Sequence, residues 1–137
     1  MTTTDRIKSS FEAQSMMETL GARLISAGDG HCVIEAPILP GSQQQHGFGH
    51  AGLTFAIGDN AAGYAALSVM PQDHEVLTSE IKINLLAPAK GNLLIARGKV
   101  VKPGRRLVVV TSEVFARTGD EEKLIALMQG TMVPVQA

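Results

Sequence analysis

A polar, glycine-rich loop that runs into a long apolar segment carries the residues best suited to chemistry in this chain. The loop ends in His50-Ala51-Gly52, and a single carboxylate, Asp59, interrupts the apolar segment nine residues after His50. The start of a helix offers free backbone N–H groups and a positive dipole end, which can polarise a carbonyl oxygen. A carboxylate in apolar surroundings is costly to bury unless it is paired or used chemically. The two features together predict an active site.

Simple helical geometry separates these two groups. If the segment after His50 is helical, the nine residues to Asp59 rise by about 13 Å and turn through about 900°. Asp59 then lies on the face opposite His50, and one subunit cannot readily bring both groups to one substrate. We predict a composite site, with the loop and His50 from one chain and Asp59 from its dimer partner.

Other polar residues near this motif have both a functional and a plain structural interpretation. The Thr78 hydroxyl could hold an attacking water or Asp59, or Thr78 could be an ordinary strand residue. The Gln44 amide could orient the water, or it could be a solvated loop side chain. His50 could be a general base, but we prefer a positioning role at the helix start. The other three histidines have no acidic residues at metal-ligand spacing, so no metal site is predicted.

Composition narrows the classes of function. The 137 residues are 18% charged with a formal net charge of −1, so overall charge favours neither nucleic acid nor an anionic membrane surface. Aromatic residues make up only 4%, which argues against base-stacking platforms. Cys32 lies in an alternating apolar run and is predicted to be a buried packing residue. With no signal-peptide or membrane-spanning pattern, we expect one domain over residues 1–137, located in the cytoplasm.

The elements that must position the candidate residues can be predicted from periodicity. An amphipathic helix is expected over about residues 4–20, followed by a hairpin of residues 23–27 and 31–38. The segment 50–69 is rich in Ala and Gly, apolar nearly all round and ended by Pro71, which is typical of a buried helix. The strand-like runs that follow suit consecutive antiparallel hairpins, and they span residues 75–86, 92–101, 106–116 and 124–135.

One buried helix with about six antiparallel strands makes an α+β fold. A single curved sheet buries only one face of such a helix, so the N-terminal helix or a second copy of the chain must cover the rest. Dimerisation is therefore expected on physical grounds.

The element order and the loop motif resemble the hotdog fold and the acyl-CoA thioesterases of its PaaI-like (phenylacetic acid degradation thioesterase) branch. That branch has Asn-x-x-Gly-x-x-His-Gly-Gly before the central helix and an Asp nine residues after the His. Here the motif is Gln44-x-x-Gly47-x-x-His50-Ala51-Gly52, with Asp59 at that spacing. The family's Thr or Ser and its Pro around the next strand correspond to Thr78 and Pro88, and its later Gly-Arg to Gly104-Arg105-Arg106. Gln44 and Ala51 depart from the pattern but keep an amide and a backbone N–H.

The resemblance implies a curved antiparallel sheet wrapped around a long central helix, and an enzyme that hydrolyses an acyl- or aryl-CoA thioester to a carboxylic acid and CoA. Asp59 would be the general base or nucleophile, and the Ala51 and Gly52 amides would form the oxyanion hole. No cofactor is implied, because CoA is part of the substrate. The resemblance also implies a homodimer with composite sites that assembles into a homotetramer.

A basic turn is the candidate for binding the CoA moiety. Gly104, Arg105 and Arg106 could meet its phosphates, because guanidinium groups pair with phosphate oxygens in a fork-like geometry. The alternative is a solvated hairpin turn. At the acyl end, Phe48, Phe55 and Met70 are expected to line part of the pocket.

Two other functions stay open at this point. A dehydratase or hydratase of acyl thioesters on the same fold would pair a His with a carboxylate, as His50 and Asp59 could across a dimer. A non-catalytic module would bind acyl-CoA without turnover, although such a module has little reason to keep Asp59 in so apolar a helix.

Overall fold

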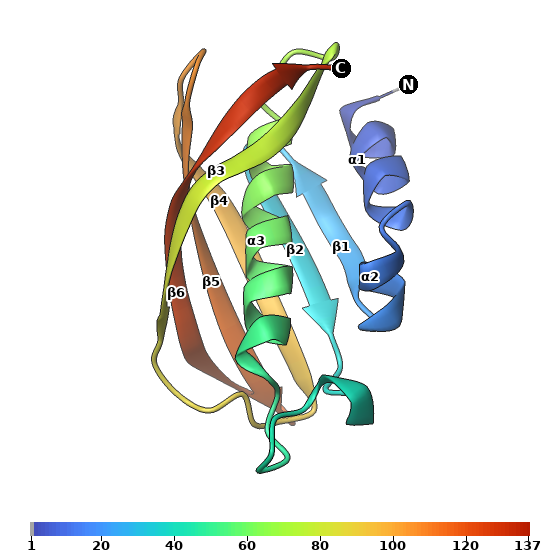
Figure 1. The fold of residues 1–137 in the computed structure, drawn as a ribbon, viewed down its shortest axis with the longest axis vertical. Coiled ribbons are helices and arrows are strands. Elements are labelled where there is room, and N and C mark those ends of the chain that lie inside the picture. Colours follow the sequence, from blue (N-terminus) through green and yellow to red (C-terminus); the bar gives the residue numbers. More distant parts are fainter. Residues whose placement is uncertain (1) are drawn as a thin grey trace.

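In a computed structural model, which describes residues 2–137, one antiparallel sheet curves around a central helix (Figure 1). The helices are α1 (Thr3–Glu12), α2 (Ser15–Thr19) and α3 (Ala51–Leu67), with a short 3₁₀ turn η1 (Pro40–Ser42). The strands are β1 (Arg23–Gly28), β2 (His31–Ala36), β3 (His74–Leu85), β4 (Leu93–Pro103), β5 (Val108–Thr118) and β6 (Glu121–Gln136). Their order in the sheet is β1-β2-β4-β5-β6-β3. The predicted α+β layout, with a curved sheet around a long helix, is confirmed.

The link between β3 and β4 differs from the prediction of consecutive hairpins. β3 pairs with β6, whereas β4 pairs with β2 and β5. Three strand spacings, about 14 Å in all, separate β3 from β4. The seven connecting residues, 86–92, can span more than about 20 Å when extended. The link is therefore long enough to cross the end of the sheet, and β3 becomes an edge strand.

The N-terminal segment forms two helices where the sequence predicts one over about residues 4–20. α1 ends at Glu12, and Gln14 has an extended backbone with φ −83° and ψ 104° before α2 begins. The Gln14 side chain meets α3, where its Nε2 donates to Asn60 Oδ1 at 2.6 Å and to Tyr64 Oη at 2.7 Å. These bonds compensate for the helical hydrogen bonds that are lost at the break.

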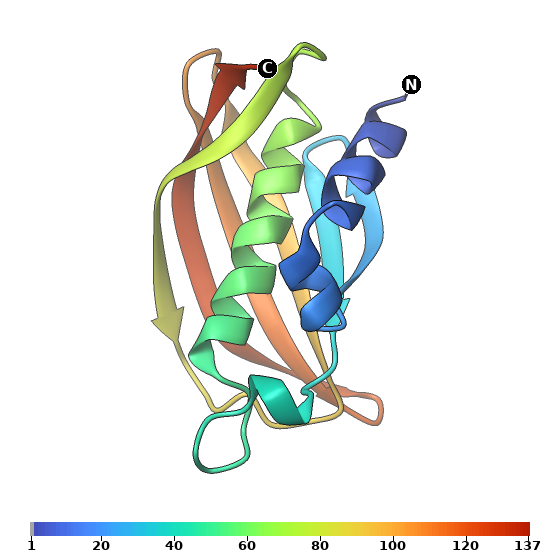
Figure 2. The same ribbon diagram turned by 45° about the vertical axis from the view of Figure 1, so that its right-hand side comes forward.

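α3 is apolar nearly all round because other elements cover it on most sides (Figure 2). The sheet packs against one side, and the N-terminal helices lie against another, where the Phe11 ring meets Tyr64 edge-on at a centroid distance of 6.2 Å. The predicted buried helix is confirmed, and the N-terminal segment, one of the two covers expected for it, contacts α3 through Ser10, Phe11 and Gln14. Within residues 2–137, no helix combines the length and the apolar character that crossing a membrane would require.

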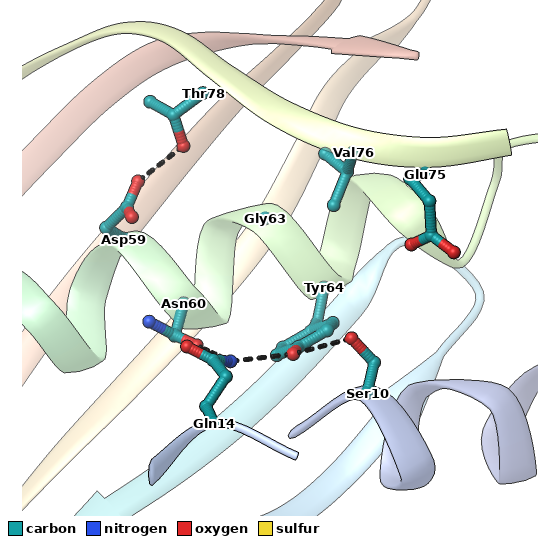
Figure 3. Close-up of a pocket in the computed structure, with 9 residues that line it drawn as sticks. All are labelled: Ser10, Gln14, Asp59, Asn60, Gly63, Tyr64, Glu75, Val76 and Thr78. Carbon is teal, nitrogen blue, oxygen red and sulfur yellow. Dashed lines mark hydrogen bonds between the residues drawn. The ribbon is translucent and has the colours of Figure 1, made fainter. Parts of the chain in front are cut away.

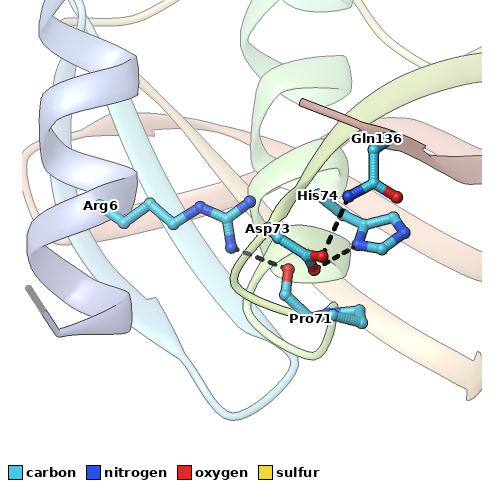
Figure 4. A network of polar contacts seen from close by, with 5 residues as sticks. All are labelled: Arg6, Pro71, Asp73, His74 and Gln136. Atoms are coloured by element: carbon cyan, nitrogen blue, oxygen red, sulfur yellow. Dashed lines mark hydrogen bonds and ion pairs between the residues drawn. The ribbon is translucent and has the colours of Figure 1, made fainter.

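Polar contacts tie α1 to the turn that follows α3 (Figure 4). Arg6 Nη1 donates to the Pro71 carbonyl oxygen at 3.2 Å. The Asp73 carboxylate pairs with His74 Nδ1 at 2.8 Å and accepts from Gln136 Nε2 at 3.0 Å, and these two contacts hold the pKa of Asp73 below its usual range. The contacts position the beginning of β3, which is the strand that carries Thr78.

Candidate active site

Asp59 lies on the side of α3 that faces β3, where Thr78 meets it (Figure 3). Thr78 Oγ1 donates to Asp59 Oδ1 at 2.7 Å and also lies 3.3 Å from Met132 Sδ. A register shift between Thr78 and Glu80 marks a β-bulge in β3, and bulges commonly re-aim side chains next to functional sites. The structure therefore brings these two predicted residues together, and Thr78 holds Asp59 directly.

The surroundings of Asp59 change its acidity. The side chain is half-buried, and this burial raises the pKa of Asp59, while the Thr78 hydrogen bond partly offsets the rise. A carboxylate that is poorly solvated is a stronger base than an exposed one, because its ionised form is less stabilised by water. Asp59 is thus suited to accept a proton from a water molecule.

A cavity of about 240 Å³ opens beside Asp59 and Thr78, between α3, β3 and the N-terminal segment (Figure 3). Its other lining residues are Ser10, Gln14, Asn60, Gly63, Tyr64, Glu75 and Val76. At its far end the Tyr64 hydroxyl accepts from Gln14 Nε2 and lies 3.0 Å from Ser10 Oγ. The N-terminal segment therefore supplies a hydrogen-bonded part of the cavity lining.

The apolar residues expected to line the acyl end of the pocket do not line this cavity within one chain. None of Phe48, Phe55 and Met70 lines it. Phe55 precedes Asp59 by four residues on the same face of α3, but it lies nearer the start of the helix with 37% of its surface exposed, and Met70 lies beyond the end of that helix. Hydrophobicity alone does not tell how far along a helix a cavity extends.

The loop residues form a second cluster at the N-terminal end of α3. Gln44, His50 and Ala51 line a cavity of about 470 Å³ that includes neither Asp59 nor Thr78. Gln44 Oε1 accepts from the backbone N–H groups of His46 and Phe48, so this oxygen holds the loop together. The separation of His50 from Asp59 within one chain agrees with the prediction that they lie on opposite faces of the helix.

His50 caps α3 and thereby decides which amide is free. Its Nδ1 accepts from the Gly52 N–H at 2.8 Å, so the Gly52 amide is already used and is not available for an oxyanion hole. No acceptor for the Ala51 N–H is found within residues 2–137, and Ala51 is exposed. Of the two amides considered, the Ala51 amide is the one that could bind a substrate oxygen.

The basic turn lies apart from both clusters. Arg105 and Arg106 are exposed between β4 and β5, at the end of the molecule opposite the loop that precedes α3 (Figures 1 and 2). Gly104 and Arg105, but not Arg106, line a further cavity beside the C-terminal end of α3. Within one chain, the predicted residues therefore fall into three groups.

Several cavity residues were not found by sequence reasoning. Gly63 follows Asp59 by four residues, so its place on the same face of α3 could have been read from helical periodicity. Ser10 and Gln14 gave no signal, because they belong to a distant segment whose position depends on how it packs on α3.

The structure also shows the surroundings of the single cysteine and of the other three histidines. Cys32 is buried, and burial raises the pKa of its thiol to about 12, which confirms the predicted packing role. His31 and His46 are exposed, and His74 pairs with Asp73. In the described part of the chain, no three or more His, Cys, Asp or Glu side chains are gathered in a way that could hold a metal ion.

Comparisons with known proteins agree with one another. Residues 46–123 match the family model described as the thioesterase superfamily. A thioesterase family protein from Silicibacter pomeroyi superposes with a TM-score of 0.93 and 41% identity over 96% of each chain. The 1,4-dihydroxy-2-naphthoyl-CoA hydrolase of Listeria monocytogenes is 25% identical over 117 residues, 85% of this chain and 93% of that protein. The E. coli PaaI protein from the phenylacetic acid degradation operon, at 24% identity and a TM-score of 0.84 over 95% of this chain and 91% of that one, shares the fold.

Proposed function

Because the chain belongs to the thioesterase superfamily, we propose that it hydrolyses an acyl- or aryl-CoA thioester to a free carboxylic acid and CoA. Its hotdog fold and its class, a thioester hydrolase, follow from the family. The Listeria relative is named as a hydrolase of a CoA thioester, which supports CoA as the leaving group here. The PaaI-like branch is part of the proposal and is supported by the loop motif.

The observation that carries the mechanism is the half-buried Asp59 held by Thr78 at the mouth of a cavity. In the proposed reaction Asp59 takes a proton from a water molecule, and the water oxygen attacks the thioester carbonyl carbon. A tetrahedral intermediate forms with negative charge on the former carbonyl oxygen. Its collapse breaks the carbon–sulfur bond, and the CoA thiolate leaves and takes up the proton. An alternative in which Asp59 attacks directly would pass through a mixed anhydride.

The second half of the site is proposed to come from another copy of the chain. Asp59 and Ala51 line separate cavities within one chain, so one subunit does not present both to one carbonyl group. β3 carries Thr78 and is an edge strand, whose outer side has no strand partner within residues 2–137. A second copy that pairs along this edge would bring its own loop toward Asp59. The N–H of Ala51 of the partner subunit would then bind the oxyanion, with the His50 cap positioning it.

The other parts of the proposal concern CoA and assembly. The exposed Arg105 and Arg106 would pair with CoA phosphates, and Gly104 would shape their turn. Two dimers would form a homotetramer, which a native molecular-mass measurement tests. A cytoplasmic location is proposed as well and is tested by cell fractionation.

The test is a thiol-release assay with short, medium-length and aromatic acyl-CoAs. Asp59→Asn should lower kcat/KM by at least about 100-fold, because general base catalysis contributes about 10²–10⁴-fold. Asp120→Asn, which changes an exposed turn carboxylate, is the matched control and should retain wild-type activity. Near wild-type hydrolysis by Asp59→Asn would remove Asp59 from the mechanism.

One additional substrate separates the alternative functions. Crotonyl-CoA that gains water but keeps its thioester bond would indicate a hydratase, whereas thiol release indicates hydrolysis. Tight binding of acyl-CoA with neither reaction would indicate a binding module.

A further inference from the structure

The cavity beside Asp59 has a stretch of wall without a side chain. Gly63 lines the cavity from α3, and it follows Asp59 by four residues, so the two share one face of the helix about one turn apart. Figure 3 shows Gly63 on the same side of the helix as Asp59, facing the strand that carries Val76 and Thr78. A group bonded to the reacting carbonyl carbon near Asp59 could extend over this position.

Neither packing nor backbone conformation requires a glycine at position 63. Gly63 is buried and its φ is negative, yet no atom beyond its own helix lies within 4 Å of a Cβ built there. Gly58 is different, because a Cβ there would overlap the Met128 side chain. Glycine is one of the least favourable residues in a helix interior, where Ala is the best. Glycine at position 63 therefore lowers the stability of α3 and leaves a space that no other part of the chain fills.

We propose that the acyl group of the substrate occupies this space, and that Gly63 is a specificity-determining residue that sets the size of the acyl group. The proposal rests on the proposed function, since it places the acyl end of a CoA thioester beside Asp59. Gln14 and Tyr64, joined by a hydrogen bond, form part of the lining, and the cavity of about 240 Å³ is smaller than the ~300–1,000 Å³ typical of ligand pockets. The space beside Gly63 thus fits a short chain or a single ring.

The test is Gly63→Ala in the full chain, assayed with acetyl-, butyryl-, hexanoyl- and benzoyl-CoA. For benzoyl- and hexanoyl-CoA, kcat/KM should fall by about ten-fold or more, mainly through a higher KM, because one methyl group in a fitted pocket has an effect of this size. For acetyl-CoA it should stay within about two-fold of wild type. The melting temperature should rise by about 2–4 °C, because Ala replaces a helical Gly without a clash.

Gly41→Ala is the matched control. A Cβ at Gly41 also meets open space and its φ is not positive, but it lies in η1, away from the cavity. Gly41→Ala should leave the relative activities toward the acyl-CoAs unchanged.

Two outcomes for Gly63→Ala would overturn the proposal. One is a higher melting temperature with unchanged relative activities toward the acyl-CoAs. The other is a lower melting temperature, which would mean that the space is not free. Wild-type activity toward acetyl-CoA alone would also overturn it, since that substrate does not need the space.

A binding measurement separates this proposal from the proposed function. Phenacyl-CoA and acetonyl-CoA are thioethers in which a methylene group lies between sulfur and the ketone carbonyl, so they are not hydrolysed. Gly63→Ala should weaken the binding of phenacyl-CoA by about ten-fold and that of acetonyl-CoA by less than about two-fold, as measured by calorimetry. If the wild type hydrolyses no acyl-CoA, the proposed function fails, and the ratio of these affinities still decides the role of Gly63. Equal weakening of both ligands, or of neither, would contradict that role.

Discussion

At the scale of single residues, the candidate site depends on one hydrogen bond, from the Thr78 hydroxyl to Asp59. Burial raises the pKa of Asp59, so folding favours the protonated carboxyl group, and ionisation costs stability as pH rises through this raised pKa. The ionised form is nevertheless the one that can act as a base. Asp59→Asn should therefore lose activity at neutral pH without losing stability, which is the pattern expected of a residue retained for chemistry.

The Thr78 bond stabilises the ionised form of Asp59, so its removal should move the pH profile. Thr78→Val keeps the shape of the side chain and removes the donor, which should raise the pKa of Asp59 further. The acid limb of kcat/KM, where activity falls as Asp59 takes up a proton, should then shift to higher pH. Rate measurements from pH 4 to 8 check the shift, and Thr78→Ser should keep the wild-type limb. A Val variant with an unmoved limb would mean that Asp59 is not the titrating base.

At the scale of elements, the position of Asp59 depends on how closely α3 lies against the sheet. Gly98 of β4 faces the helix, and a Cβ there would overlap the backbone of Ala61. Because backbone atoms cannot rotate away as a flexible side chain can, only a shift of the helix would relieve the overlap. Such a shift would also move Asp59 relative to Thr78.

Gly98→Ala should therefore destabilise the fold by at least about 2 kcal/mol, the scale of overpacking in a dense core. The measurement is chemical unfolding, with a melting temperature lower by about 5 °C or more as the parallel readout. Gly63→Ala, the same exchange on the facing helix, should change stability in the opposite direction. Similar stability of Gly98→Ala and wild type would mean that α3 and the sheet are less tightly packed than the structure has them.

At the scale of the whole molecule, the free edge of β3 and the separate clusters of site residues favour a site shared by two copies.

A substitution at Ala51 can disable one half of this shared site. Ala51 is the first residue of α3, where Pro is well tolerated, and the preceding His50 has φ −64° and ψ 144°, a conformation that Pro permits in its neighbour. Ala51→Pro should keep the helix and remove only the N–H.

Mixed dimers of Ala51→Pro and Asp59→Asn test the shared site. Each variant alone should be inactive, whereas a mixed dimer has one intact site, so a random mixture should regain about a quarter of wild-type activity. Thiol release after co-refolding, with mixed dimers verified by native mass spectrometry, checks this outcome. Verified mixed dimers without activity would place both halves of the site in one chain.

Local patterns were sufficient to predict much of this protein from its sequence. The buried helix, the strands and the opposite placement of His50 and Asp59 follow from side-chain periodicity and helix geometry, which involve only neighbouring residues. The edge position of β3 could not be predicted this way. A turn signal shows that the chain changes direction, but it does not show whether residues 86–92 form a hairpin or cross the end of the sheet. The cavity around Gly63 and its wall at Gln14 also depended on the tertiary structure, because they form only where a distant segment packs on α3. The sequence thus predicted which carboxylate is suited to chemistry, and long-range packing determined the space beside it.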